Sequence, residues 1–434
     1  MNGRRVGDWL PPLSGGSTFH YHPAWLEAPE RRVLSLSLPF TPGNVQHTGK
    51  AVANFFDNLL PDSDEIRRRL RRRYSTPSPE AFDLLTALGR DCVGAVQLLP
   101  EGEEPTDFDR IVGESLDEAG VEHALDSALS GNPIAGQEDE DEFRISIAGA
   151  QEKTALLFQK DRWWKPRGST PTTHIFKLPL GLIGNLQLNM RDSVENEWLC
   201  SRIMTAFGLR TAPCEIARFG GKKALIVERF DRQWQGKTWI ARLPQEDFCQ
   251  ALGVAGADKY ENEGGPGVAD ILRVLDTSSQ AVRDKRAFVK AQLIFWLLAA
   301  TDGHAKNFSI FHERGGTYRL TPFYDVLSAW PVIGHGAGLI DLRRAQLAMA
   351  LRGKKPHRKL LEIQPRHWDW ATRLAGMGSA SDLIEEVLAE IPHALQAVRS
   401  ELPPGFPAHV AESIFAGIEA QAKRLTEPDT TVRG

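Results

Sequence analysis

The stretch Thr301-Asp302-Gly303-His304-Ala305-Lys306-Asn307 directly follows an apolar run that ends at Ala300. The run belongs to a helical pattern over 283–300, and an Asp-Gly pair is typical of the turn that ends a helix. One loop thus contains an acid, an imidazole, an amine and an amide. Asp302 and Asn307 are five residues apart, close to the spacing of phosphotransfer catalytic loops, in which the Asp accepts the substrate hydroxyl proton and the Asn holds a metal ion. The stretch therefore predicts a phosphotransfer loop after a packed helix, although an Asp-Gly pair alone predicts only a turn.

A second carboxylate follows at the end of an apolar strand pattern. Asp325 stands 18 residues after Asn307, in Leu320-Thr321-Pro322-Phe323-Tyr324-Asp325. Mg²⁺ needs few protein oxygens when phosphate oxygens complete its shell, so Asn307 and Asp325 are sufficient ligands. A strand-capping Asp is the simpler explanation of Asp325 taken alone.

Short strand patterns fill the part of the chain before this helix. They cover 143–147, 154–159, 173–178, 214–218 and 223–229, and one helix pattern covers 193–207. Lys177 lies on the apolar strand 173–178, where a charge is costly unless it is paired or faces a cleft. Glu195 and Glu197 on the following helix are candidate partners, as in phosphotransferases that hold phosphates with a paired strand lysine. A lysine at a strand edge with a solvated amine is the alternative.

A turn of small residues precedes the second of these strands. It is Ser146-Ile147-Ala148-Gly149-Ala150-Gln151-Glu152-Lys153-Thr154. Small residues let backbone N–H groups approach an anion closely. The stretch matches neither a Walker A motif nor the three-glycine kinase loop, so an ordinary hairpin is an equally simple explanation.

Composition and periodicity divide the chain into parts. Its 434 residues, 41% hydrophobic and 25% charged, are typical of a globular protein of two or three domains. The first hundred residues mix strand patterns at 33–38 and 92–100 with helix patterns at 52–60 and 61–66, and nearly everything after Gln245 has a helical pattern. A further helix is predicted over 116–129. We expect an α+β protein with an N-terminal accessory α/β domain (1–104), an acidic connector (105–142), a strand-rich small lobe (143–230) and a helical large lobe (231–434).

Charge is distributed unevenly along the chain. The net charge of −4 includes fifteen acids and one base between 101 and 142, so the remainder carries +10. Basic clusters at 67–73 and 343–359 can attract phosphate backbones, or can simply be solvated faces. The four cysteines are far apart, which argues against disulfides and zinc. The longest apolar run is much shorter than the roughly 20 residues of a membrane span, and no secretion signal is evident, so we expect a cytoplasmic protein without a membrane partner.

Taken together, these blocks resemble those of the HipA family, serine/threonine kinases that act as the toxin of a bacterial toxin–antitoxin pair. The resemblance extends in order over nearly the whole chain. The matching blocks are 54–63, 89–96, 146–156, 173–179, 227–232, 242–247, 301–307 and 321–325.

The resemblance implies a two-lobed, protein-kinase-like fold that uses ATP and Mg²⁺. It implies that Asp302 is the proton acceptor, and that Asn307 and Asp325 hold the metal. The implied nucleotide-binding residues are the phosphate loop Ala148, Gly149, Ala150, Gln151, Glu152 and Lys153; the phosphate-contacting Lys177; the adenine-side hinge Glu228, Arg229 and Phe230; and His304, Ala305, Lys306, Asn307, Tyr324 and Asp325.

The resemblance also implies regulation and partners. Ser146 corresponds to the autophosphorylation site, and a charge of about −2 there would repel ATP and expel the phosphate loop. The implied substrate is glutamyl-tRNA synthetase, and the implied outcome is growth arrest and persistence. The implied partners are a HipB-type helix-turn-helix antitoxin and, through it, operator DNA.

Two other classes of protein remain as alternatives. One is a non-catalytic DNA-binding corepressor, which the two basic clusters would favour. The other is a metal-dependent phosphate hydrolase that uses Asp302, His304 and Asp325.

Overall fold

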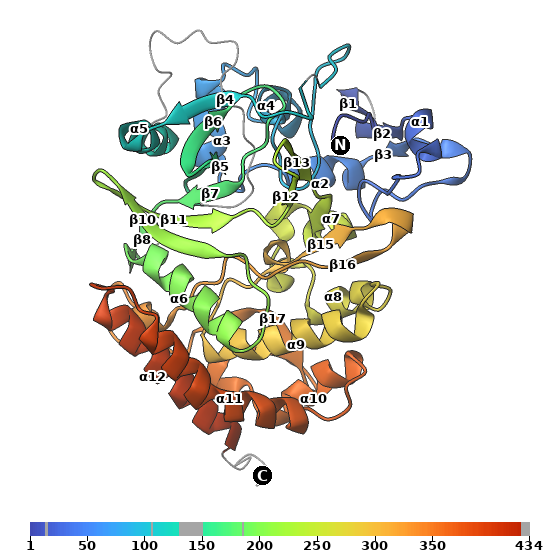
Figure 1. Cartoon of the computed structure of the whole chain (residues 1–434). Helices are drawn as coiled ribbons and strands as arrows, with labels where there is room; N and C mark the ends of the chain where they lie inside the picture. The colour runs from blue at the N-terminus through green and yellow to red at the C-terminus, as the bar shows by residue number, and fades with distance from the viewer. Residues whose placement is uncertain (14–15, 106, 130–150, 185, 427–434) are drawn as a thin grey trace. The chain divides into compact units, whose positions relative to one another are not determined.

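The chain forms two compact units in a computed structural model that describes residues 1–13, 16–105, 107–129, 151–184 and 186–426 (Figure 1). Unit 1 comprises residues 1–178, 217–259 and 309–318, and unit 2 comprises residues 179–216, 260–308 and 319–434. The predicted strand 143–147 lies outside the described residues.

The N-terminal part of unit 1 is a three-stranded antiparallel sheet packed against helices. The strands, in spatial order, are β1 (Gly7–Leu13), β2 (Gly16–Tyr21) and β3 (His47–Thr48). The helices are α1 (Pro23–Glu27), α2 (Lys50–Asp57), α3 (Asp64–Arg73) and α4 (Ala81–Leu88). Alternate residues of β2 are buried, which gives the sheet one core face. Aromatic rings fill that core, with Trp9 stacked on Phe56 at 4.0 Å between ring centroids.

A second sheet of unit 1 carries several of the predicted site residues. Its strands, in spatial order, are β10 (Cys214–Phe219), β11 (Lys222–Glu228), β7 (His174–Lys177), β5 (Lys153–Gln159), β6 (Arg162–Pro166) and β4 (Gly113–Leu116). The helix α5 (Glu118–Leu129) lies beside β4 and β5 (Figure 1). Val121 and Leu125 of this helix, Leu156 and Phe176 form a common core. The strand patterns at 154–159, 173–178, 214–218 and 223–229 are thereby confirmed.

Two antiparallel strand pairs and a short helix complete unit 1. The elements are β12 (Arg232–Gln235) with β13 (Trp239–Arg242), β14 (Gln245–Asp247) with β15 (Ser309–His312), and α7 (Phe248–Leu252). The helix α7 packs against α2, so the N-terminal part is built into this unit.

Unit 2 is mainly helical. Its helices are α6 (Ser193–Ala206), α8 (Val268–Leu275), α9 (Ala281–Leu297), α10 (Pro365–Leu374), α11 (Ser381–Ser400) and α12 (Ala408–Thr426). Every residue of α9 from 288 to 297 is buried, as expected for a helix that neighbours surround. The neighbours include α8, α10 and α12, and Figure 1 shows α9 among them. Even Lys290 is buried, where its amine pairs with Glu386 and Glu390 at 2.9 Å each.

The expectation that nearly everything after Gln245 is helical is wrong. Besides β14 and β15, this part contains β16 (Tyr318–Leu320) and the hairpin of β17 (Gln346–Arg352) with β18 (Pro356–Lys359). β17 contains the run Gln346-Leu347-Ala348-Met349-Ala350-Leu351-Arg352, in which the five central residues are all buried. A strand buried on both faces does not alternate, so it cannot be distinguished from a buried helix by periodicity.

Two predicted strands near the N-terminus are also wrong. Residues 33–38 form only an isolated bridge between Ser35 and Leu38, and residues 92–100 form no strand. In the first segment, the backbone N–H of Leu36 donates to the Glu246 carboxylate over 2.8 Å. In the second, arginine side chains bind backbone oxygens such as that of Cys92. Side chains far along the chain therefore replace the strand partners that both segments would otherwise need.

None of the described helices has the length and apolar character needed to cross a membrane.

Candidate functional site

The loop after α9 is folded back on itself by hydrogen bonds. The helix ends at Leu297, earlier than the Asp-Gly turn predicted, because Ala299 adopts a φ of 49° and the N–H of Ala300 donates to Phe295 O over 2.8 Å. Beyond this cap, the N–H of His304 donates to Asp302 O over 2.8 Å. The side-chain amide nitrogen of Asn307 donates to the same oxygen over 2.7 Å. Asn307 therefore fixes the backbone of Asp302.

The residues of this loop differ in how far they are buried. The side chain of Asp302 is 62% exposed, whereas His304, Ala305, Lys306 and Asn307 are buried. A carboxylate exposed beside a fixed, buried loop can accept a proton from a group that arrives from solvent.

Gly303 has a packing reason to be glycine. A Cβ at this position would lie 2.5 Å from Cδ2 of Phe295, well inside contact distance. The Phe295 ring in turn packs on Phe308, with ring centroids 5.7 Å apart. The loop is therefore pressed directly onto the aromatic core at the end of α9.

Tyr260 contacts Asp302 and was not found by sequence reasoning. Its hydroxyl donates to Asp302 Oδ1 over 2.6 Å, and its ring lies edge-on to the His304 ring with centroids 5.0 Å apart. His304 Nε2 lies 3.9 Å from the same Asp302 oxygen. The tyrosine stands 42 residues before Asp302 in a loop without any motif, so no local signal could have indicated it.

Asp325 lies next to this loop and has a strained backbone. Phe323 packs edge-to-face on Phe308 with centroids 6.1 Å apart, and the Tyr324 hydroxyl donates to Lys306 O over 2.9 Å. Asp325 itself has a φ of 60°, in the left-handed region that non-glycine residues rarely adopt. Such strain persists only where surrounding contacts impose it, and it is concentrated at functional sites.

The segment that follows Asp325 is held by contacts of Ser328 and Asn196. The Ser328 hydroxyl donates to Leu298 O over 2.6 Å, and the N–H of Ala329 donates to Ala299 O over 3.0 Å. The amide of Asn196 on α6 both donates to Ser328 O at 2.8 Å and accepts from its N–H at 2.9 Å. The segment after Asp325 is therefore tied to the end of α9 and to α6.

The side-chain oxygens of Asn307 and Asp325 are suitable ligands for a hard divalent cation. The amide nitrogen of Asn307 is used by Asp302, so the amide oxygen is its atom for a metal, and Asp325 adds a carboxylate. Oxygen ligands of this kind, completed by phosphate oxygens, suit Mg²⁺. Across the described residues no group of three or more His, Cys, Asp or Glu side chains is arranged to hold a metal, and an Asn–Asp pair does not need one.

In unit 1, Lys177 lies on a central strand beside a second lysine. It is 7% exposed, and in the antiparallel register it stands directly opposite Lys153 of β5 and Leu225 of β11. Residues directly opposite each other share one face of the sheet, and like charges there repel. Two amines on one face of a sheet can together attract an anion such as a phosphate. Glu195 and Glu197 are buried on α6, and their pairing with Lys177 stays a prediction.

The described end of the predicted phosphate loop is attached at two points. The Gln151 amide donates to Leu178 O, and the N–H of Leu178 donates to Glu152 O over 3.3 Å. Arg69 of α3 forms an ion pair with Glu152. The remaining predicted loop residues and the predicted autophosphorylation site lie outside the described residues; these are Ala148, Gly149 and Ala150, and Ser146.

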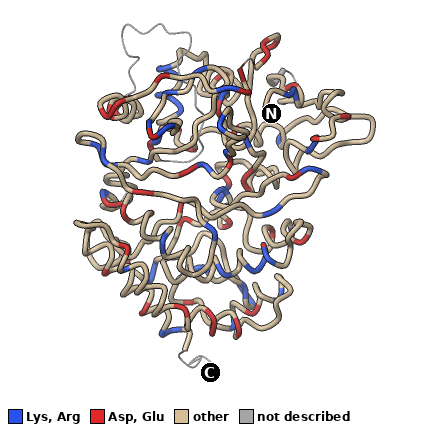
Figure 2. Tube along the Cα trace, in the orientation of Figure 1, with Lys and Arg blue, Asp and Glu red and all other residues tan. Residues whose placement is uncertain are grey.

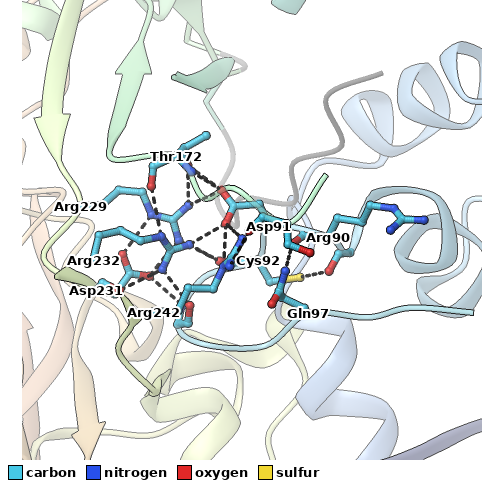
Figure 3. A network of polar contacts seen from close by, with 12 residues as sticks. Arg90, Asp91, Cys92, Gln97, Thr172, Arg229, Asp231, Arg232 and Arg242 are labelled. Atoms are coloured by element: carbon cyan, nitrogen blue, oxygen red, sulfur yellow. Dashed lines mark hydrogen bonds and ion pairs between the residues drawn. The ribbon is translucent and has the colours of Figure 1, made fainter. Parts of the chain in front are cut away.

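The predicted hinge ends β11 with alternating exposure. Glu228 is exposed, Arg229 is buried and Phe230 is half-buried. The N–H of Arg229 donates to Thr173 O over 2.8 Å, and the Phe230 ring lies edge-on to Phe311 with centroids 5.7 Å apart. The Arg229 side chain enters a buried network of charged groups (Figure 3). The Arg229 side chain is therefore not available to a ligand.

The structure places the predicted residues in two groups. Unit 2 brings together the loop 302–307 and the segment 324–325, and unit 1 brings together Lys153 and Lys177 on one sheet with the hinge 228–230. The meeting of both groups around one nucleotide stays a prediction.

The two basic clusters are partly neutralised by acids. Basic and acidic residues are interspersed along the trace of each unit (Figure 2). Ion pairs of the clusters are Arg67–Asp57, Arg69–Glu152, Arg343–Asp341, Arg352–Glu261, Arg358–Glu261 and Lys359–Glu362. These pairs reduce the positive charge that each cluster can offer to a phosphate backbone.

Known proteins resemble this chain over nearly its full length. Residues 1–99 match the HipA N-terminal domain, and residues 145–398 match the HipA-like C-terminal domain. The protein Y4mE of Sinorhizobium fredii, named as a kinase, is 34% identical over 87% of this chain and 85% of its own length. The serine/threonine-protein kinase toxin HipA of Shewanella oneidensis is 27% identical over 88% of this chain and 86% of its own.

Solved structures agree with these relatives. Shewanella oneidensis HipA, in a complex with HipB and operator DNA, superposes with a TM-score of 0.77 at 23% identity, covering 97% of this chain and 95% of that one. This match confirms the predicted α+β, protein-kinase-like fold. The domain match spans more than half of the chain, and Y4mE adds identity above 30% over most of it. The chain therefore belongs to the HipA family, a family of kinases.

Proposed function

We propose that this protein is an ATP- and Mg²⁺-dependent serine/threonine protein kinase that acts as a bacterial toxin. The observation that carries the proposal is the hydrogen-bonded loop in which Asn307 fixes the backbone of an exposed Asp302, next to the strained Asp325. Kinases need a proton acceptor, a metal-holding amide and a metal-holding carboxylate in this arrangement.

Each side chain has one role in phosphate transfer. The exposed Asp302 accepts the proton of the substrate hydroxyl while the hydroxyl oxygen attacks the γ-phosphate. The Tyr260 hydroxyl holds Asp302 Oδ1 in place. Asn307 and Asp325 would hold Mg²⁺, which when bound neutralises charge on the phosphates. Lys153 and Lys177 attract the phosphates, and the backbone of Glu228–Phe230 contacts the adenine.

The finer identity of the substrate and partners is part of the same proposal. The substrate is glutamyl-tRNA synthetase, and autophosphorylation of Ser146 inactivates the kinase by introducing charge beside the phosphate loop. A HipB-type antitoxin neutralises the protein and links it to operator DNA, which is supported by the relative whose solved complex contains HipB and DNA. Growth arrest and persistence are the expected outcome. The cytoplasm is the expected place of action, in keeping with the free cysteines at 92, 200, 214 and 249.

Transfer of labelled γ-phosphate from ATP tests the proposal. The purified chain should label itself in the presence of Mg²⁺, mass spectrometry should locate the phosphate on Ser146, and EDTA should abolish the labelling. Asp302→Ala should reduce labelling by three orders of magnitude or so, within the range seen when an essential proton acceptor is removed. Asp382→Ala, at an exposed acid of α11, is the matched control and should label normally.

Other outcomes would favour the alternatives. Equal labelling of Asp302→Ala and the wild type would remove the role of Asp302. Release of free phosphate without labelled protein would indicate a hydrolase. Salt-dependent DNA binding by the isolated chain, without nucleotide binding, would indicate a corepressor.

A further inference from the structure

We propose that Asp91, in the N-terminal domain, is a positioning residue for the nucleotide site, because it anchors the buried charge network that fixes the hinge Glu228–Phe230. This inference rests on the proposed kinase function. It assigns the N-terminal domain a direct part in nucleotide affinity.

Asp91 is the centre of this network (Figure 3). Its Oδ2 accepts from the N–H and the hydroxyl of Thr172, over 3.0 and 2.6 Å. Its Oδ1 accepts from Arg232 over 2.9 Å and from Arg242 over 3.2 Å, and Arg229 lies 3.3 Å from Oδ2. One carboxylate of the N-terminal domain thus binds three arginines from later parts of unit 1.

The hinge is attached to residues 91–94 by further hydrogen bonds. Arg229 donates to both carboxylate oxygens of Asp231, at 3.0 and 2.8 Å, and to Cys92 O at 2.8 Å. The Asp231 carboxylate in turn accepts from the N–H of Gly94 over 2.7 Å. Gly94 has a φ of 74°, and a Cβ there would lie 2.8 Å from Gln245 O, so glycine is required for this approach. The backbone at 229–231 therefore cannot shift without breaking bonds to residues 91–94.

The three buried arginines of the network need the carboxylates of both Asp91 and Asp231 to balance their charge. Three guanidinium groups and two carboxylates lie together, and each of their side chains is 4% exposed or less. Burial alone would raise the pKa of Asp91, but Arg232, Arg229 and Arg242 outweigh it and hold the pKa well below its ordinary value. Neutralising Asp91 would leave three buried arginines around one carboxylate.

Such a network is better suited to fixing geometry than to adding stability. Buried ion pairs often stabilise no more than apolar side chains of the same volume, because desolvation offsets their attraction. Their directional bonds do fix a unique backbone arrangement. Here the fixed backbone belongs to the segment whose neighbours, Glu228 and Phe230, are expected to contact adenine.

Asp91→Asn in the full-length protein tests the inference. The substitution keeps the shape of the side chain but removes its charge. Steady-state phosphorylation should show a KM for ATP raised on the order of 10-fold, with a smaller change in kcat, and calorimetry should show ADP affinity reduced by a similar factor. Asn54→Ala is the control, since it removes a different anchor of the N-terminal domain, the 2.8 Å bond to Gly253 O, and should leave the KM unchanged.

A milder variant keeps the test decisive if Asp91→Asn does not fold. Thr172→Val keeps the charge of Asp91 but removes the 2.6 Å hydroxyl bond to Asp91 and the 2.9 Å bond that the same hydroxyl accepts from Arg229, and should raise the KM for ATP about 3-fold. A folded Asp91→Asn protein with the wild-type KM and ADP affinity would overturn the inference, as would an equal rise in KM for Asn54→Ala. Absence of ADP binding and of labelling in the wild type would instead overturn the proposed kinase function itself.

Discussion

Replacing Asn307 by Asp separates the two roles that the structure gives this residue. The wild-type amide nitrogen donates to Asp302 O over 2.7 Å, and the amide oxygen is its atom for the metal. The aspartate keeps an oxygen for the metal but has no donor. Asn307→Ala removes both atoms and serves as the comparison.

The expected loss of kcat in Asn307→Asp follows from the burial of this hydrogen bond. Asn307 is 5% exposed, so the Asp302 carbonyl cannot readily exchange its lost donor for water. The carbonyl keeps the N–H of His304 as a donor, so the lost bond costs about 0.5–1.5 kcal/mol, and the repulsion of a carboxylate oxygen facing the carbonyl adds to this cost. If misplacement of Asp302 raises the free energy of the transition state by about 2 kcal/mol, kcat falls about 30-fold.

Steady-state kinetics at several Mg²⁺ concentrations measures both roles. Asn307→Asp should lose kcat while its half-saturating Mg²⁺ concentration stays near the wild-type value. Asn307→Ala should lose kcat and also need more Mg²⁺. Thermal melting should first show that both variants are folded. An Asn307→Asp protein whose kcat is within about 2-fold of the wild type would refute the reasoning, because the bond to Asp302 would then have no catalytic consequence.

Three further changes have expected outcomes. Tyr260→Phe removes the 2.6 Å bond to the exposed Asp302, so we expect kcat to fall about 5-fold, for about 1 kcal/mol, with the KM for ATP unchanged; an unchanged kcat would show that the bond is incidental. Gly303→Ala places a Cβ 2.5 Å from the Phe295 ring and should lower the free energy of unfolding by about 1–3 kcal/mol in urea titrations, and a neutral result would mean that the ring can move. His367 is 2% exposed. Burial lowers its pKa from 6.5 to about 4, and the neighbouring His357 and Arg366 contribute to the same shift. The unfolded chain therefore binds this proton more readily, and the stability present above pH 6.5 is lost as the pH falls towards 4. Between pH 7.5 and 4.5 the wild type should lose about 2–3 kcal/mol more than His367→Gln, and equal losses in urea titrations would contradict the assignment.

Much of the secondary structure was predictable because it has a local signal. Helical patterns predicted the helices at 52–60, 193–207 and 283–300, and α2, α6 and α9 confirm them, whereas the pattern at 61–66 only overlaps the start of α3 at Asp64. Short strand patterns predicted four strands of the sheet that contains Lys177. The same signal failed at β17, where both faces are buried, and at 33–38, where side chains bind the backbone.

The candidate site was predictable in its residues but not in its contacts. The spacing of Asp302, Asn307 and Asp325 indicated phosphotransfer, and the structure places the loop 302–307 beside the segment at Asp325. Sequence reasoning named Arg229 only as part of the hinge that the family resemblance implies. In the structure it also contacts Asp91, 138 residues away, through a network that no spacing indicates.

The sequence by itself determined the chemical types in the loop 301–307, the family resemblance and most helices and strands, because short-range spacing and periodicity are written directly in the order of residues. Only the tertiary structure decided that Tyr260 contacts Asp302, that Asp325 adopts a left-handed backbone and that Asp91 binds three arginines. The physical reason is that these contacts join side chains far apart in the chain. Burial and packing select such partners, and neither is encoded in the local pattern around any one of them.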